Sequence, residues 1–140
     1  MTQLNQSTVA YHIGSAFRLV GELDRSALER SWQRIVDRHE ILRTRFVLAD
    51  GEPMLSVVED ARIQTRYRDL RKEADPVGCA DALYSDLFAE PFDLGHGLPL
   101  RAQLIQIHDR EFELQWVTHH IVSDGWSIGV MLKELSEIYA

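Results

Sequence analysis

The residues best suited to chemistry stand near the end of the chain, where His119 and His120 adjoin after an apolar run. Asp124 and Gly125 follow, and this Asp-Gly pair predicts a turn that opens a helix. An imidazole gains or loses a proton near neutral pH, and N–H groups at a helix N-terminus can stabilise a developing negative charge. The spacing therefore indicates a site suited to proton transfer and charge stabilisation.

The two histidines are not equivalent if a strand continues through them. A strand is predicted over residues 112–118, with Trp116 on its apolar face. Strict alternation then places His120 on that face and His119 on the opposite one. We therefore expect His120 to point inward as the catalytic residue and His119 to be structural. The alternative is that both are ordinary hydrogen-bonding residues at the end of a strand.

Asp124 has two possible roles. Its spacing from His120 would let both bind one metal ion on a helix, but Ser123 and Gly125 disfavour a helix there, and we expect no metal. Arg43 lies on the polar face of another predicted strand and would need a partner if buried. A guanidinium–carboxylate pair with Asp124 meets that need. Gly125 permits a positive φ and close approach of a substrate, although it could also be a plain turn glycine.

The elements that must position this motif follow from the hydrophobic periodicity. Helices are predicted to begin at Asp24, at Asp75-Pro76 and after the motif, where Ser127 or Asp124 would be the N-cap. We therefore expect one α+β unit, a mostly antiparallel sheet covered by about three helices. Residues 1–10 are polar without periodicity and are expected to form a poorly ordered lead-in. Alternating patterns predict strands over residues 11–20, 42–48, 53–58, 62–67, 100–108 and 112–118.

Length and composition exclude several classes of protein. The 140 residues suffice for about one domain, and 45% hydrophobic with 26% charged residues is typical of a globular chain. The net charge of -7 argues against a nucleic-acid partner. Cys79 is the only cysteine, so there is no internal disulfide. No apolar run is long enough to span a bilayer and no leader pattern is present, so we expect a cytoplasmic protein without a membrane partner.

Three blocks of sequence resemble the condensation domains of nonribosomal peptide synthetases. Residues 119–127 resemble the HHxxxDG signature, and residues 38–46, RHEILRTRF, match the family's RHExLRTxF. A looser third block, residues 91–94 followed by 99–102, is similar to the family's PFDL and PLLRA stretches. HHxxxD alone is shared by several acyltransferases. The three blocks together, in order and at family-like separation, are highly specific.

This resemblance implies a fold with two lobes. The family fold resembles chloramphenicol acetyltransferase, in which two similar lobes form a V with a tunnel between them. The resemblance implies that residues 11–140 are the N-terminal lobe, that the C-terminal lobe is absent, and that the family's first motif is missing. A lobe without its partner is expected to expose apolar surface, which favours self-association.

The resemblance also implies an activity. His120 would be the catalytic histidine, Gly125 would lie where the thioester carbonyl arrives, and Asp124 would pair with Arg43 to hold the motif. The reaction implied is amide formation, in which an acceptor aminoacyl amine attacks a donor acyl or peptidyl thioester. Donor and acceptor carrier domains would present both substrates on phosphopantetheine arms, so the chain would need no cofactor of its own. Whether His120 takes a proton or only orients the amine is open at this stage.

Two other functions compete with this interpretation. The chain could be a non-catalytic folded fragment that docks carrier proteins, or a related acyltransferase that uses coenzyme A thioesters. Trp126-Ser127 after the motif favours condensation. Related epimerisation domains share the double histidine but usually continue differently after the aspartate.

Overall fold

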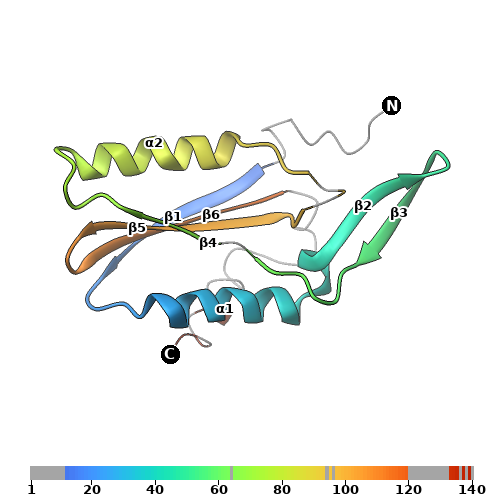
Figure 1. Ribbon diagram of the computed structural model, residues 1–140, viewed down its shortest axis with the longest axis horizontal. Coiled ribbons are helices and arrows are strands. Elements are labelled where there is room, and N and C mark those ends of the chain that lie inside the picture. The colour runs from blue at the N-terminus through green and yellow to red at the C-terminus, as the bar shows by residue number, and fades with distance from the viewer. Residues whose placement is uncertain are drawn as a thin grey trace.

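The computed structural model describes residues 12–63, 65–93, 95, 97–119, 133–135, 137 and 139. In this part of the chain a four-stranded sheet lies between two long helices, one on each face (Figure 1). Residues 1–10, the expected lead-in, fall outside it. Among the residues described, no helix is long and apolar enough to cross a membrane.

The sheet has the strand order β1 (His12–Val20), β6 (Glu111–His119), β5 (Leu100–His108) and β4 (Thr65–Asp69). β6 is antiparallel to both of its neighbours, whereas β4 runs parallel to β5. The expected α+β class with a mostly antiparallel sheet is therefore confirmed. Because β1 and β6 pair along their whole lengths, the beginning of β1 lies beside the end of β6, where the histidine motif starts.

Helix α1 (Arg25–Arg38) covers one face of the sheet. It begins where the sequence predicts, because the Asp24 side chain accepts a hydrogen bond from the Ala27 N–H at 3.1 Å. Its apolar stripe is buried against the side chains of the central strands. The main core therefore consists of Leu28, Trp32, Ile35 and Val36 from α1 with Leu100, Ala102, Leu104, Phe112, Leu114 and Trp116 from the sheet.

Helix α2 (Pro76–Ala89) covers the opposite face. Asp75 is its N-cap and accepts from the Gly78 N–H at 3.1 Å, and Pro76 occupies the first turn, as predicted. Gly14 of β1 makes room for this helix. A Cβ atom at Gly14 would lie 2.9 Å from the hydroxyl oxygen of Tyr84 and 2.6 Å from the carbonyl oxygen of Trp116.

The strand predicted from residue 42 begins later than expected. Residues Glu40–Arg43 form a 3-10 helix, η2, and only then does β2 (Thr44–Ala49) start. Arg43 therefore lies in a helical turn and not on the face of a strand, which corrects the expectation. The turn is closed by the Leu42 N–H, which donates to the carbonyl of His39 at 3.0 Å, a contact that an alternating pattern does not reveal. The strand expected over residues 62–67 likewise begins later, as β4.

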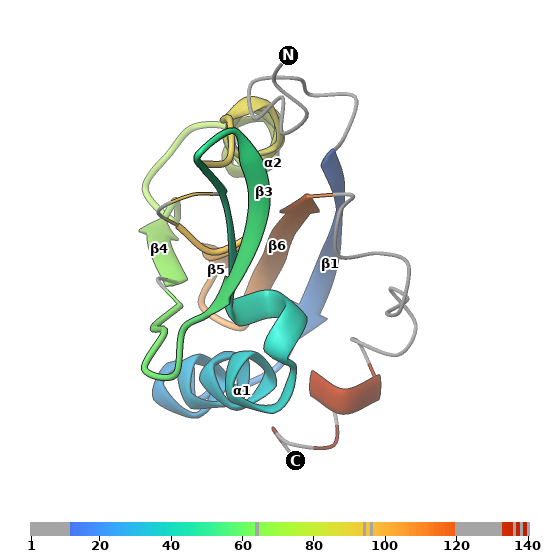
Figure 2. The same cartoon turned by 90° about the vertical axis from the view of Figure 1, so that its right-hand side faces the viewer.

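Strand β2 pairs with β3 (Glu52–Val57) in a separate two-stranded hairpin. Asp50 and Gly51 join the strands with positive φ angles of 53° and 80°, the backbone that such a turn requires. Asp50 and Gly51 thus connect the two strands predicted over residues 42–48 and 53–58. Figure 2 shows the hairpin standing in front of the layers formed by α1, α2 and the sheet. Residues 133–135, 137 and 139 are helical, in agreement with the predicted last helix as far as it is described.

Candidate functional site

The predicted site residues fall on both sides of the boundary of the described structure. His120, Asp124 and Gly125 lie outside the described residues, so their assigned roles stay predictions. His119, the last residue of β6, and Arg43 of η2 are described. The described flanks of the motif are the end of β6 and the helical residues 133–135, 137 and 139.

His119 is packed into the α2 face of the sheet. It is 5% exposed, and its backbone N–H donates to the carbonyl of Pro99 at 3.0 Å. Its ring centroid lies 6.1 Å from that of Phe92, in an edge-to-face arrangement. Val117, two residues earlier, packs on this same face with Leu87 and Phe92. The predicted alternation of the strand therefore continues as far as His119.

His12 lies directly beside His119, and the sequence analysis did not identify it. The two residues are partners in the β1–β6 register, and their ring centroids are 6.2 Å apart. The Nδ1 atom of His12 is 2.5 Å from the carbonyl oxygen of Phe88. Because a carbonyl only accepts, Nδ1 carries the proton and donates. The ring also meets Phe92 edge-on at 5.0 Å. We call His12, Phe88, Phe92 and His119 the histidine cluster.

The burial of the second ring nitrogen of His12 destabilises the fold. Nε2 is buried and has no hydrogen-bond partner in the described structure. Leaving a buried polar atom unpaired costs about 1–3 kcal/mol. No signal in the sequence could have found this residue, because only the long-range pairing of β1 with β6 brings it to the motif.

Arg101 of β5 binds the backbone at the end of α2 and contacts Phe92 of the histidine cluster. Its guanidinium donates to the carbonyls of Leu87 at 3.0 Å, Pro91 at 3.1 Å and Glu90 at 2.5 Å. The last carbonyls of a helix have no partner within it, so these bonds replace the missing ones. The guanidinium also lies 3.9 Å from the ring centroid of Phe92. Burial lowers the pKa of Arg101.

Arg43 performs a similar task at the end of α1. Its guanidinium donates to the carbonyls of Val36, Asp37 and Val58, at 3.1, 3.1 and 3.3 Å respectively. It therefore ties the end of the helix to the residue that follows β3. The predicted pair with Asp124 lies outside the described residues.

The far flank of the motif is fixed to α1. Glu134 approaches Nε2 of His39 to 2.6 Å and the guanidinium of Arg38 to 3.8 Å. Leu135 is buried, and the hydroxyl of Tyr139 accepts from the Asp24 N–H at 3.0 Å. Residues before and after the motif are thus held by opposite layers of the fold. Sequence reasoning treated His39 only as part of a matching block and missed this contact.

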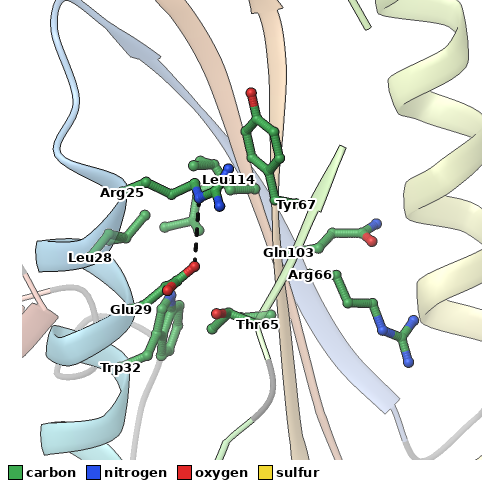
Figure 3. Close-up of a pocket in the computed structure, with 11 residues that line it drawn as sticks. Arg25, Leu28, Glu29, Trp32, Thr65, Arg66, Tyr67, Gln103 and Leu114 are labelled. Carbon is green, nitrogen blue, oxygen red and sulfur yellow. Dashed lines mark ion pairs between the residues drawn. The ribbon is translucent and has the colours of Figure 1, made fainter. Parts of the chain in front are cut away.

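Two hollows do not adjoin the histidine cluster. The pocket between α1 and β4 in Figure 3, where Arg25 lies 4.1 Å above the ring of Tyr67, encloses only about 10 Å³, room for about one water molecule. A larger apolar groove of about 600 Å³ lies at the Val20–Phe112 end of the β1–β6 pair. At about 3.3 Å per residue, that end is roughly 20 Å from His119.

A third hollow, of about 550 Å³, does adjoin the cluster because Phe92 and Arg101 line it. Arg45, Arg62 and Arg66 also line it. Arg66 makes two hydrogen bonds of 3.1 Å to Glu90, and this guanidinium lowers the pKa of the Glu90 carboxyl. Three carboxylates, those of Asp60, Glu90 and Asp93, line the same hollow, so it combines one aromatic ring with charges of both signs.

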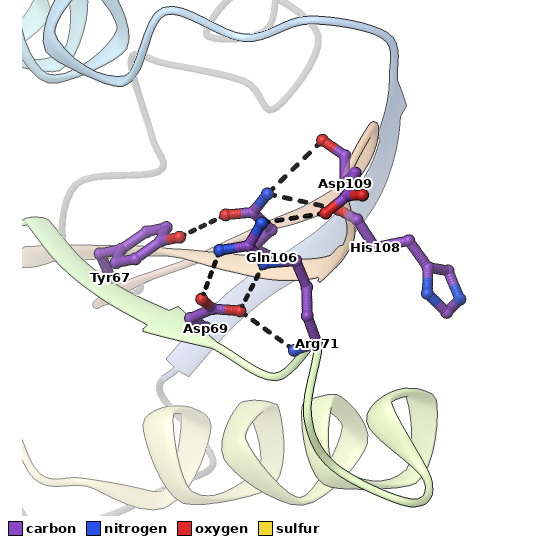
Figure 4. Close-up of polar contacts among 6 residues, drawn as sticks. All are labelled: Tyr67, Asp69, Arg71, Gln106, His108 and Asp109. Atoms are coloured by element: carbon purple, nitrogen blue, oxygen red, sulfur yellow. Dashed lines mark hydrogen bonds and ion pairs between the residues drawn. The ribbon is translucent and has the colours of Figure 1, made fainter.

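A polar network lies at the Asp69 end of β4, apart from the histidine cluster (Figure 4). Arg71 binds Asp69 at 2.8 Å and Asp109 at 2.9 Å, which joins the end of β4 to the turn between β5 and β6. The Arg71 hydrogen bonds lower the pKa of Asp69 to about 2. The hydroxyl of Tyr67 donates to the side-chain carbonyl of Gln106 in the same network. The network is exposed, and its charged groups pair with one another, which is typical of a structural contact.

Among the described residues, no group of three or more histidine, cysteine or acidic side chains could hold a metal ion, and His120 and Asp124 lie outside them.

Comparison with known proteins gives consistent matches along the chain. The family model described as "Condensation domain" matches residues 1–140. The chain is 39% identical over 99% of its length to malpinin synthetase of Mortierella alpina, and 34% identical over 98% to bacitracin synthase 2 of Bacillus licheniformis. It spans only 2% and 5% of the lengths of these two relatives.

Solved structures match as well. The first condensation domain of the calcium-dependent antibiotic synthetase is similar with a TM-score of 0.85 and 26% identity over 96% of this chain. The starter condensation domain of rhizomide synthetase is similar in fold, with a TM-score of 0.87, at 20% identity over 98%. The chain covers 33% of each of these structures.

Proposed function

Because the chain belongs to the condensation-domain family, we propose that it is the N-terminal lobe of a domain that joins two carrier-bound substrates by an amide bond. The observation that carries this proposal is the family match over residues 1–140, which includes the HHxxxDG motif. The anchoring of His119 in the histidine cluster supports it, because a catalytic group needs a rigid base. The domain would act as an acyltransferase.

The chemistry requires one nucleophilic attack and the loss of two protons from the acceptor nitrogen. The acceptor amine attacks the donor thioester carbonyl, a C–N bond forms, and the C–S bond breaks to release a thiol. An α-amine with a pKa of about 8 must be deprotonated to attack, and its adduct must lose a further proton. The His120 imidazole accepts that proton in this proposal, a contribution typically of about 10²–10⁴-fold in rate. Gly125 would leave space for the carbonyl.

The partners follow from the same proposal. Donor and acceptor carrier domains would present the thioester and the amine on phosphopantetheine arms, and the remaining lobe would complete the tunnel. We place the protein in the cytoplasm, where a synthetase would meet its substrates, and propose that the isolated lobe self-associates through its open surface.

The decisive experiment compares His120→Ala with the parent sequence in a complete condensation domain carrying this segment. Loaded donor and acceptor carrier proteins are mixed with each variant, and the amide product is measured. We expect the substitution to reduce the rate by about 10²-fold or more. His108→Ala, at an exposed position, is the matched control and should retain full activity. Equal product from His120→Ala and the parent would refute the catalytic role.

The same assay distinguishes the alternative functions. Carrier binding without product would identify a non-catalytic docking lobe. Product from acyl-coenzyme A, but not from loaded carriers, would identify a related acyltransferase. Repeating the assay with the 140-residue chain alone tests whether one lobe suffices.

A further inference from the structure

We propose that His12 is a positioning residue for the histidine motif. In this proposal His12 fixes His119 against the end of α2 and thereby sets the position from which the chain continues to His120. The inference rests on the proposed function, because it assigns His12 a part in that reaction. His12 itself touches no reacting atom.

Contacts of His12 join β1, β6 and α2. Its backbone pairs β1 with β6 at His119, and its Nδ1–H holds the carbonyl of Phe88 near the end of α2. Its ring packs edge-on against Phe88 and Phe92, with centroid separations of 5.8 and 5.0 Å. Phe92 in turn contacts the ring of His119. Movement of the His12 ring would therefore disturb His119 both directly and through Phe92.

Packing alone does not account for a histidine at this position. An apolar ring would fill the same space and would avoid the unpartnered, buried Nε2. An asparagine could donate to the carbonyl of Phe88 but would not fill the space between the aromatic rings. A histidine combines the directed hydrogen bond with a flat ring. The structure thus retains a buried, unpartnered Nε2 at a position where the His12 ring sets both the distance and the orientation of the His119 ring.

The consequence for the reaction is a loss of turnover without a loss of binding. A displacement of about 1 Å in a catalytic group can cost roughly a hundredfold in rate. We expect His12→Asn and His12→Phe to lower kcat by about ten- to a hundredfold and to leave KM for the acceptor carrier unchanged. Each variant retains one half of the function of His12, the donor or the ring.

The first measurement uses the 140-residue chain and does not depend on activity. Long-range proton–nitrogen spectra of labelled histidines should show the His12 ring protonated at Nδ1. The ring signals of His119 should shift in both His12 variants and stay unchanged in His108→Asn, which alters an exposed histidine at the end of β5. Unchanged His119 signals in the His12 variants would overturn the proposal.

The second measurement is the carrier assay in a complete condensation domain with His12→Asn, His12→Phe, His108→Asn and His120→Ala. Full activity of His120→Ala would refute the proposed function and leave the spectra to decide the contact. If His120→Ala is inactive while a folded His12 variant keeps the parent kcat, the positioning role is wrong. Activity lost only in proportion to unfolded protein would also overturn it, since a purely structural residue behaves in this way.

Discussion

At the scale of single residues, the space available for a side chain restricts the residue type as strongly as its chemistry does. Gly14 is the clearest case, because β1 passes close to both β6 and α2 at this residue. A methyl group there would meet the backbone carbonyl of Trp116, which cannot rotate away as a side chain can. Gly14 lies two residues from His12, so this close approach also brings the histidine cluster under α2.

Gly14→Ala should destabilise the chain by about 1–3 kcal/mol, because the added atom overpacks a closed interface. Urea unfolding followed by circular dichroism measures this difference. Gly97→Ala is the matched control, since a Cβ there would come no closer than 3.4 Å to the carbonyl oxygen of Asp93. Equal stability of the two variants would show that β1 can shift away from both β6 and α2.

At the scale of elements, the ends of helices and strands are held by single side chains. Arg101 binds three carbonyls at the end of α2 and stacks on Phe92, with little exposure of its side chain. Arg18, in contrast, forms one exposed ion pair with Glu111 at 3.2 Å. We therefore expect arginine to contribute far more to stability at position 101 than at position 18.

Arg101→Ala should cost about 2–4 kcal/mol, because it leaves the part-buried carbonyls of Leu87 and Glu90 without this donor and removes the packing on Phe92. Arg18→Ala should cost under about 1 kcal/mol, the usual value of an exposed ion pair. Thermal and urea unfolding of both variants measure the contrast. A smaller loss for Arg101→Ala than for Arg18→Ala would mean that α2 does not depend on this cap.

A second prediction at this scale concerns the network of Asp69, Arg71 and Asp109. The pKa of Asp69 is lowered from 3.8 to about 2, so its carboxylate is favoured in the folded state. Its contribution to stability is therefore present above pH 4 and is lost as the pH falls through 2.

Asp69→Asn should be less stable than the parent chain near neutral pH, and this difference should shrink between about pH 4 and pH 2. Urea unfolding across that range tests both the size and the sign of the effect. A difference that grows on acidification would contradict the assigned pairing with Arg71.

At the scale of the whole molecule, the described surface leaves apolar groups uncovered. Met54, Leu55 and Val57 of β3 are 51%, 66% and 44% exposed. Among the described strands β3 pairs only with β2, so its outer edge offers backbone groups to another strand. Because the chain covers 33% of the similar condensation-domain structures, more polypeptide accompanies the matching segment in those proteins.

The 140-residue chain should self-associate as its concentration rises, and Leu55→Asp should weaken the association. Sedimentation velocity over a hundredfold concentration range measures this behaviour. Val77→Asp, which places the same charge on α2 at a residue 44% exposed, should leave it unchanged. Identical profiles for both variants would place the contact elsewhere on the surface.

Local patterns in the sequence determined most of the elements. Asp24 and Asp75 mark both helix starts because an N-cap depends only on neighbouring residues. The Asp50-Gly51 turn and the alternation of β6 are equally local. The family could also be identified from three short blocks, and the match over residues 1–140 confirms it.

Only the tertiary structure decided which distant residues meet. The position of His12 beside His119 and the contact of His39 with Glu134 join segments far apart in the sequence. The 3-10 turn at Arg43 escaped prediction because its side chain is tied to α1 while its neighbours alternate like a strand. Periodicity tells which face of an element is buried, but strand register and helix packing decide what that face touches.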